Sequence, residues 1–228
     1  MTGPRLARRT LAIVAAAALA FPATDASAAP ISPLDPAVIG TGWTQVDPAK
    51  TIQVVSHGTA HPHDWATTTQ AAEDGVSYSR SGGIETFKLL SKSSNRVEVR
   101  VHNDYKTGLR QFEGDLKVAA PTEDESCMQI FGNDGPGATT LMIRAYAADG
   151  GTLRGLGKVL ATGVFGKWVH INVIHDATAN KVSVYIGGQL TATGSGPTGT
   201  HYFKYGVYGT LQATNAQTQW KNVKYFQK

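Results

Sequence analysis

The sequence has little of what stabilises small cross-linked domains or marks highly charged ones. Its 228 residues include one cysteine, Cys127, which excludes an internal disulfide, so the fold depends on its own core. Charged residues make up only 17% and the net charge is +4, which excludes a disordered, charge-rich chain and gives no argument for nucleic-acid binding. No long stretch has a helical period. A length of 228 residues favours one domain with a sizeable core.

The first 28 residues have the pattern of an export signal. A basic start is followed by an apolar run at 11–21, which is too short to span a bilayer core of about 30 Å as a helix. Ala26-Ser27-Ala28 matches a signal-peptidase site. We predict cleavage after Ala28 and a secreted, extracellular protein with no membrane segment; a membrane anchor is the alternative. Residues 29–51 are expected to form a lead-in segment and residues 52–228 the folded domain.

From Ile52 onward, apolar and polar residues alternate between glycine-rich breaks, which is the pattern of short β-strands. A short helix is possible only after Asp35 or near Asp64. Many antiparallel strands in about 200 residues predict an all-β protein: a two-sheet jelly roll or concanavalin-like sandwich with a concave groove. The predicted strands are Arg96–His102, Phe112–Val118, Cys127–Phe131, Thr140–Tyr146, Trp168–His175, Lys181–Ile186, Tyr202–Tyr208 and Trp220–Phe226.

Three of these strands place unusual polar residues on one face, since side chains alternate along a strand. The first carries Arg96, Glu98, Arg100 and His102; the second Gln129 and Phe131; the third Tyr202, Lys204 and Tyr208, with Gly206 between. Arginine and lysine bind carboxylates, and aromatic rings cover sugar faces. A cationic, phenol-rich floor of this kind predicts a binding site for an anionic, acidic polysaccharide.

The same three segments resemble the signature strands of the alginate lyases of polysaccharide lyase family 7. They read Arg96-Val-Glu-Val-Arg100, Gln129-Ile-Phe131 and Tyr202-Phe-Lys-Tyr-Gly-Val-Tyr208. The glucuronan lyases of family 20 share the jelly-roll architecture. The resemblance extends from Arg96 to the C-terminus. It implies a secreted enzyme that cleaves a uronic-acid polymer by β-elimination, acts as a monomer and needs no organic cofactor.

The resemblance also implies roles for the polar residues. Arg96 and Gln129 would neutralise the substrate carboxylate, and Tyr208 would take the C5 proton and return it to the leaving oxygen. Arg100 and Lys204 would favour the phenolate of Tyr208. Glu98 would orient the arginines, while Tyr202 and Lys204 would line the binding subsites.

One position departs from the family pattern. Phe131 stands where the middle motif usually has histidine, which removes the residue usually assigned as base or neutraliser. One tyrosine can serve both steps when the C5 proton and the C4 oxygen lie on the same side of the ring. Mannuronate and glucuronate allow that route, and guluronate does not. The absence of this histidine therefore favours a glucuronan or mannuronan substrate. His102 or His57 could take the place of the missing histidine.

Other interpretations stay open at this point. The chain could be a non-catalytic carbohydrate-binding module, or a glycoside hydrolase that pairs Glu98 with Glu113. The polar strand could be an ordinary salt ladder. A metal site is a minor alternative, either at the histidines of His57-x-x-x-His61-x-His63 or, for calcium, at residues 133–135. Cys127 is expected to be a small buried hydrophobe.

Overall fold

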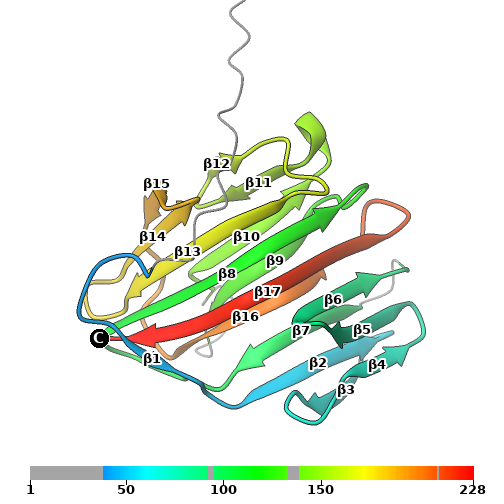
Figure 1. The fold of residues 1–228 in the computed structure, drawn as a ribbon, viewed down its shortest axis with the longest axis horizontal. Coiled ribbons are helices and arrows are strands. Elements are labelled where there is room, and N and C mark those ends of the chain that lie inside the picture. The colour runs from blue at the N-terminus through cyan, green and yellow to red at the C-terminus, as the bar shows by residue number, and fades with distance from the viewer. Residues whose placement is uncertain (1–37, 92–94, 133–138, 210) are drawn as a thin grey trace, which may run out of the picture. The chain divides into compact units, whose positions relative to one another are not determined.

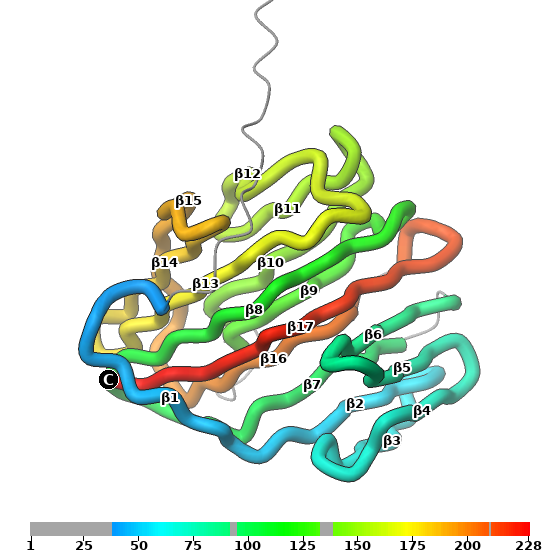
Figure 2. Tube along the Cα trace, viewed as in Figure 1, coloured from blue at the N-terminus to red at the C-terminus, as the bar shows by residue number. Residues whose placement is uncertain are grey.

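The structure, a computed structural model, describes residues 38–91, 95–132, 139–209 and 211–228. The expected signal peptide and the candidate calcium segment 133–135 lie outside these residues. Within them, seventeen strands form two antiparallel sheets (Figures 1 and 2). We call them the β8 sheet and the β16 sheet, after a central strand of each.

The β8 sheet has the order β15-β14-β13-β8-β17-β6-β5-β4, and β1 also pairs with β17. Its strands are β1 (Thr44–Val46), β4 (Gln70–Glu73), β5 (Val76–Ser81), β6 (Ile84–Leu89), β8 (Leu109–Ala119), β13 (Trp168–Asp176), β14 (Lys181–Ile186), β15 (Gln189–Gly194) and β17 (Ala216–Gln227). The β16 sheet has the order β12-β11-β10-β9-β16-β7-β2-β3. Its strands are β2 (Lys50–Ser56), β3 (Thr59–Asp64), β7 (Arg96–Val101), β9 (Glu125–Gly132), β10 (Leu141–Tyr146), β11 (Thr152–Gly155), β12 (Lys158–Ala161) and β16 (His201–Gly209).

The core lies between the two sheets and follows the period of two. In β7, the three valines at 97, 99 and 101 are fully buried, while Arg96 and Arg100 on the other face are partly exposed. Phe112 from the β8 sheet packs against Phe203 from the β16 sheet, with ring centres 5.8 Å apart. Trp220 packs edge-on against Phe112 at 5.4 Å. The alternation that predicted strands therefore also selects the side chains that hold the sandwich together.

The all-β sandwich is confirmed, and each of the eight predicted strands overlaps an observed one. The helix expected near Asp64 is wrong: β3 runs to Asp64, and the Asp64 carboxylate then accepts a hydrogen bond from the Ala66 amide in a turn. A single 3₁₀ turn, Ala148–Gly150, is found among the described residues. Part of the expected lead-in segment is strand, since β1 and the start of β2 fall within it. No helix of the described chain is long and apolar enough to cross a membrane.

Candidate active site

The three motif strands lie side by side, with β16 between β7 and β9. The pairing places Tyr208 opposite Arg96, and Lys204 opposite both Arg100 and Gln129. Residues opposite each other in a ladder share a face, so these side chains gather on the side of the β16 sheet that faces away from the core. We call this side the site face. It unites the polar sets that the sequence predicted strand by strand.

Arg96 and Tyr208 are in direct contact. The guanidinium carbon of Arg96 lies 4.3 Å from the centre of the Tyr208 ring. The ammonium of Lys204 lies 6.0 Å from the same ring centre. Arg100, which was expected beside Tyr208, instead lies over Tyr202, 4.0 Å from that ring centre. The cations at Tyr208 are thus Arg96 and Lys204, because the register sets Arg100 opposite Lys204, two rows further along the same face of the sheet.

Glu98 is the centre of a buried network under the site face. Its Oε2 lies 2.5 Å from the Lys204 Nζ, and its Oε1 accepts a hydrogen bond from the Gln129 amide. The side chains of Glu98 and Lys204 are only 1% and 2% exposed, so this is a buried ion pair. The expected arginine partners of Glu98 are replaced by Lys204 and Gln129. Because Glu98 takes the amide nitrogen, Gln129 keeps Oε1 as a buried acceptor without a partner.

Aromatic rings continue the network toward Arg100. The Lys204 ammonium lies 5.3 Å from the centre of the Phe131 ring, and Phe131 packs against Tyr202 at 5.4 Å. Phe131 is partly exposed and Tyr202 is buried. Contacts therefore run without a break from Arg100 through these rings and Lys204 to Tyr208 and Arg96.

His102 is close to Arg100 but has both ring nitrogens engaged. Its Nδ1 lies 2.5 Å from an Arg100 Nη, and its Nε2 lies 2.8 Å from the Thr51 hydroxyl. Since arginine can only donate, Nδ1 accepts and Nε2 carries the proton. Burial and the Arg100 charge lower the pKa of His102. Asp104 holds the other side of Arg100 with two bonds of 2.9 Å. His102 adjoins a hollow of about 330 Å³ between β2 and β3, lined also by His63 and Asp64.

The structure does not bring His57 next to Tyr208. His57 lies in the turn after β2, where its Nε2 is 2.8 Å from the Asp74 carboxylate and its amide donates to Asn95. His61 pairs with Glu73 at 3.6 Å. Within the described chain, no three histidine, cysteine or acidic side chains are grouped so as to hold a metal ion. Cys127 is buried as expected, and burial raises the pKa of its thiol to about 12.

Two residues on the site face were missed by the sequence analysis. Ser126 lies opposite Tyr208, and Arg144 of β10 lies opposite Ser126. Arg96, Tyr208, Ser126 and Arg144 therefore form one row across four strands. The Ser126 hydroxyl is buried without a partner, and Asp124 holds the Arg144 guanidinium at 2.8 Å. The alternation of Met142, Arg144 and Tyr146 was the available signal, but alternation does not tell which row a residue joins.

The fold and this face define a jelly-roll protein with cationic and aromatic side chains gathered on one sheet. Comparison with solved structures identifies the fold more specifically: the chain has the fold of the alginate lyases of polysaccharide lyase family 7. An alginate lyase from a Corynebacterium species superposes with a TM-score of 0.63 at 14% identity, covering 82% of this chain and 94% of that one. A family 7 alginate lyase from Zobellia galactanivorans gives 0.60 at 13% identity, with coverages of 79% and 95%. At such low identity these comparisons establish the fold alone.

Sequence comparison gives a different kind of relative. The citrate-binding protein of Hevea brasiliensis is 35% identical over 145 residues, which are 61% of this chain and 59% of that protein. The chain thus matches less than two thirds of the length of this curated relative. No family model matches the chain.

Proposed function

We propose that the protein is a secreted polysaccharide lyase that cleaves a uronic-acid polymer by β-elimination. The observation that carries the proposal is the contact of Arg96 with Tyr208, 4.3 Å from guanidinium carbon to ring centre. On the same face Arg100 is partly exposed, and Lys204 and Gln129 are buried beneath it. A phenol next to a carboxylate-binding guanidinium is the minimum that this reaction needs from a protein. The lyase fold of the solved neighbours supports the same conclusion.

In the proposed reaction, Tyr208 removes the proton from C5 of a uronate residue. The electrons of that bond form the C4–C5 double bond, and the glycosidic oxygen leaves C4 with a proton returned by Tyr208. Arg96 binds the carboxylate on C5 and offsets the charge that the enolate-like intermediate places on it. Arg96 also stabilises the phenol oxygen while that oxygen is ionised.

The remaining residues bind and orient the polymer. Lys204 is neutralised by Glu98, so its role is to position Gln129 and the Phe131 ring as much as to supply charge. Gln129 is fully buried and holds Glu98 in place beneath the site face, and Arg100 with Tyr202 forms the next subsite. His102 and His57 have partners of their own and are given no catalytic step. With Phe131 in the histidine position, we infer a glucuronan or mannuronan substrate, for which one tyrosine serves both proton transfers.

Ultraviolet absorbance tests this proposal directly. The protein is incubated with glucuronan, polymannuronate and polyguluronate, and the unsaturated uronate product is followed by its absorbance. We expect the signal with at least one of the first two polymers and a loss of at least about 100-fold in Tyr208→Phe. Tyr185→Phe, on a strand of the other sheet, is the matched control and should keep full activity. Reducing ends without absorbance would instead identify a hydrolase.

Binding of a carboxylate without cleavage is the second candidate function. The buried Glu98–Lys204 pair and Phe131 are both compatible with a binding protein, and the curated relative is named for citrate. Calorimetric titration with citrate distinguishes the two. Saturable citrate binding that Arg96→Gln abolishes, together with no absorbance change on any uronan, would favour this candidate over the lyase.

A further inference from the structure

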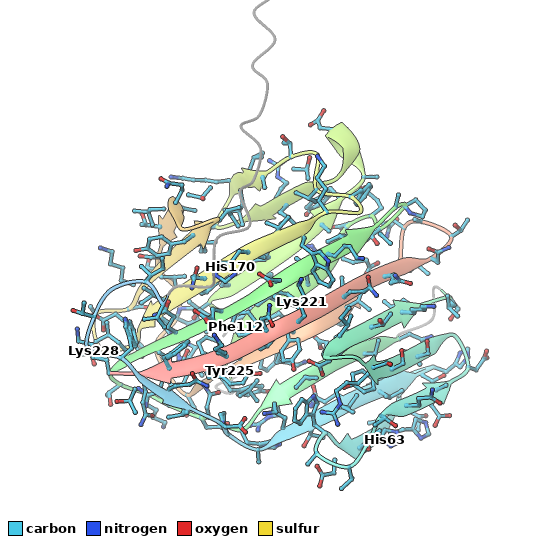
Figure 3. The ribbon with its side chains drawn as sticks, viewed as in Figure 1. His63, Phe112, His170, Lys221, Tyr225 and Lys228 are labelled. Atoms are coloured by element: carbon cyan, nitrogen blue, oxygen red, sulfur yellow. The ribbon has the colours of Figure 1, made fainter. Side chains whose placement is uncertain are left out.

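On the side of β17 away from β8, two short strands pair with it and leave a gap between them. Strand β17 pairs with β6 through Ala216–Trp220 and with β1 through Tyr225–Gln227. Between them, residues 221–224 form a bulge against β8 and, among the described residues, have no strand on the other side. Figure 3 labels Lys221, where this interval begins, and Tyr225, the first residue after it. The β8 sheet therefore has an opening here.

The opening leads into a hollow of about 390 Å³, which we call the β17 hollow. Its lining includes Lys50, Trp65, Arg80, Glu85, Lys221 and Lys224. The hollow does not include Arg96, Gln129 or Tyr208. Its volume lies in the lower part of the range of small-molecule sites, roughly 300–1,000 Å³, so it fits one small ligand and not a polymer.

The one buried carboxylate of the β17 hollow, Glu85, is already held by donors of the protein. Its Oε1 accepts from the Trp65 indole at 2.6 Å and from the Tyr78 hydroxyl at 2.8 Å. Its Oε2 accepts from the Tyr205 hydroxyl at 2.7 Å. A carboxylate with three such bonds is satisfied within the fold. Glu85 therefore anchors the floor and leaves little capacity for binding a cation.

Lys50 supplies a buried positive charge to the same hollow. Its side chain is 7% exposed, and its one carboxylate partner, Asp47 at 2.6 Å, is 83% exposed. The ammonium also lies 4.1 Å from the centre of the Trp65 ring and 5.7 Å from that of Tyr225. An ammonium has three donors and no acceptor. It is thus set to donate to a ligand that enters the hollow.

The remaining charges favour an anion. Arg80 is anchored through Nη2 to the Trp65 carbonyl at 2.9 Å, and Lys224 pairs with Glu113 at 3.2 Å. The Lys221 ammonium lies 4.5 Å from the centre of the Trp168 ring, which does not line the hollow, so this ammonium adds charge near the hollow without a contact in it. Four cations line the hollow against the carboxylates of Asp47 and Glu85, and with Glu113 on Lys224 the balance stays positive by one charge. Arg80 lies 4.0 Å from the Trp65 ring centre, so with Lys50 it occupies the ring that a neutral sugar would stack on.

We propose that the β17 hollow is a second binding site, separate from the site face, for a small carboxylate anion that also carries hydroxyl groups. Lys50 binds a carboxylate oxygen, and Asn222 with the Lys224 ammonium meets the hydroxyls. This proposal does not depend on the lyase activity, because none of its residues belongs to the site face.

Tartrate, a dihydroxy dicarboxylate, is the probe for this site. Calorimetric titration of the full chain at low ionic strength should give saturable binding at one site. We expect Lys50→Gln to weaken the affinity about tenfold, the effect of losing one charge-assisted contact. Lys117→Gln is the matched control, because it removes the same charge from a lysine that lies over the Trp168 ring at 4.7 Å and does not line the hollow. It should bind tartrate like the wild type.

Two further measurements separate this site from the site face and from general anion attraction. Arg96→Gln should leave tartrate affinity unchanged, whereas loss of binding in this variant would place tartrate on the site face and overturn the proposal. The Trp65 indole N–H signal in NMR spectra, identified by Trp65→Phe, should shift saturably with tartrate. An unshifted indole signal, no saturable binding, or an equal loss in Lys117→Gln would each also overturn it.

Discussion

The guanidinium carbon of Arg96 lies 4.3 Å from the centre of the Tyr208 ring, across the pairing of β7 with β16. The two residues come from distant parts of the chain, and the ladder brings them together in one row. That row continues through Ser126 to Arg144. A uronate residue whose carboxylate is bound at Arg96 would have its C5 hydrogen beside the phenol of Tyr208. This is why the contact carries the proposed function.

The buried Glu98–Lys204 pair leads to a prediction about stability. Glu98→Gln leaves the Lys204 ammonium buried without a counter-charge, and we expect it to lower the free energy of unfolding by about 3–5 kcal/mol. The double variant Glu98→Gln with Lys204→Met removes both charges and should recover more than half of the loss. Urea unfolding of wild type, both single variants and the double variant measures this. Simple additivity of the two single effects would contradict the prediction.

Position 131 should influence which polymer is cleaved. Phe131→His places an imidazole beside Tyr202 and within reach of the Lys204 ammonium, which lies 5.3 Å from the present ring. Guluronate needs an acid and a base on opposite sides of the ring, so we expect the ratio of kcat/KM for polyguluronate over polymannuronate to rise about tenfold. Phe131→Leu is the control for lost ring packing. A ratio that rises equally in both variants would count against an acid–base role for the histidine.

The position of β16 that pairs with Glu98 requires a glycine, Gly206. Its φ is +144°, and a Cβ there would lie 2.7 Å from the Glu98 Cα. Gly206→Ala should destabilise the protein by about 2–4 kcal/mol, since backbone must move in two paired strands. Gly187→Ala is the matched control, because its φ of +56° is also strained but its Cβ would meet no atom within 4 Å. Thermal unfolding of both variants tests the difference, and equal shifts in Tm would contradict it.

Glu125 should make stability fall as the pH rises. Its carboxylate is fully buried at the start of β9 with no hydrogen-bond partner, and burial raises its pKa to about 7. The folded state therefore keeps a proton that the unfolded chain loses at a lower pH. The stabilisation is complete below the unfolded pKa and is lost as the pH rises through about 7.

Glu125→Gln removes this titration. Relative to wild type, the variant should gain up to about 3 kcal/mol of unfolding free energy between pH 5 and pH 8. Urea unfolding at both pH values measures the gain. Glu123→Gln, two residues earlier in the chain and partly exposed, is the control and should show little change in this pH dependence. A parallel pH dependence in wild type and Glu125→Gln would show that another group is responsible.

The sequence by itself determined the class of fold and the composition of each strand face. Alternation is a local property, so Arg96, Glu98 and Arg100 could be assigned to one face without knowing their neighbours. The same holds for Tyr202, Lys204 and Tyr208. Resemblance to the signature strands then identified which three faces to combine.

Only the tertiary structure decided how those faces meet. The register of β16 against β7 and β9 sets Arg96, not Arg100, at Tyr208, and gives Glu98 to Lys204 and Gln129. It also brings in Ser126 and Arg144, which no motif marks, and leaves His57 with Asp74. Register depends on packing between strands far apart in the chain, and a period of two is the same for every register that keeps the core face inward.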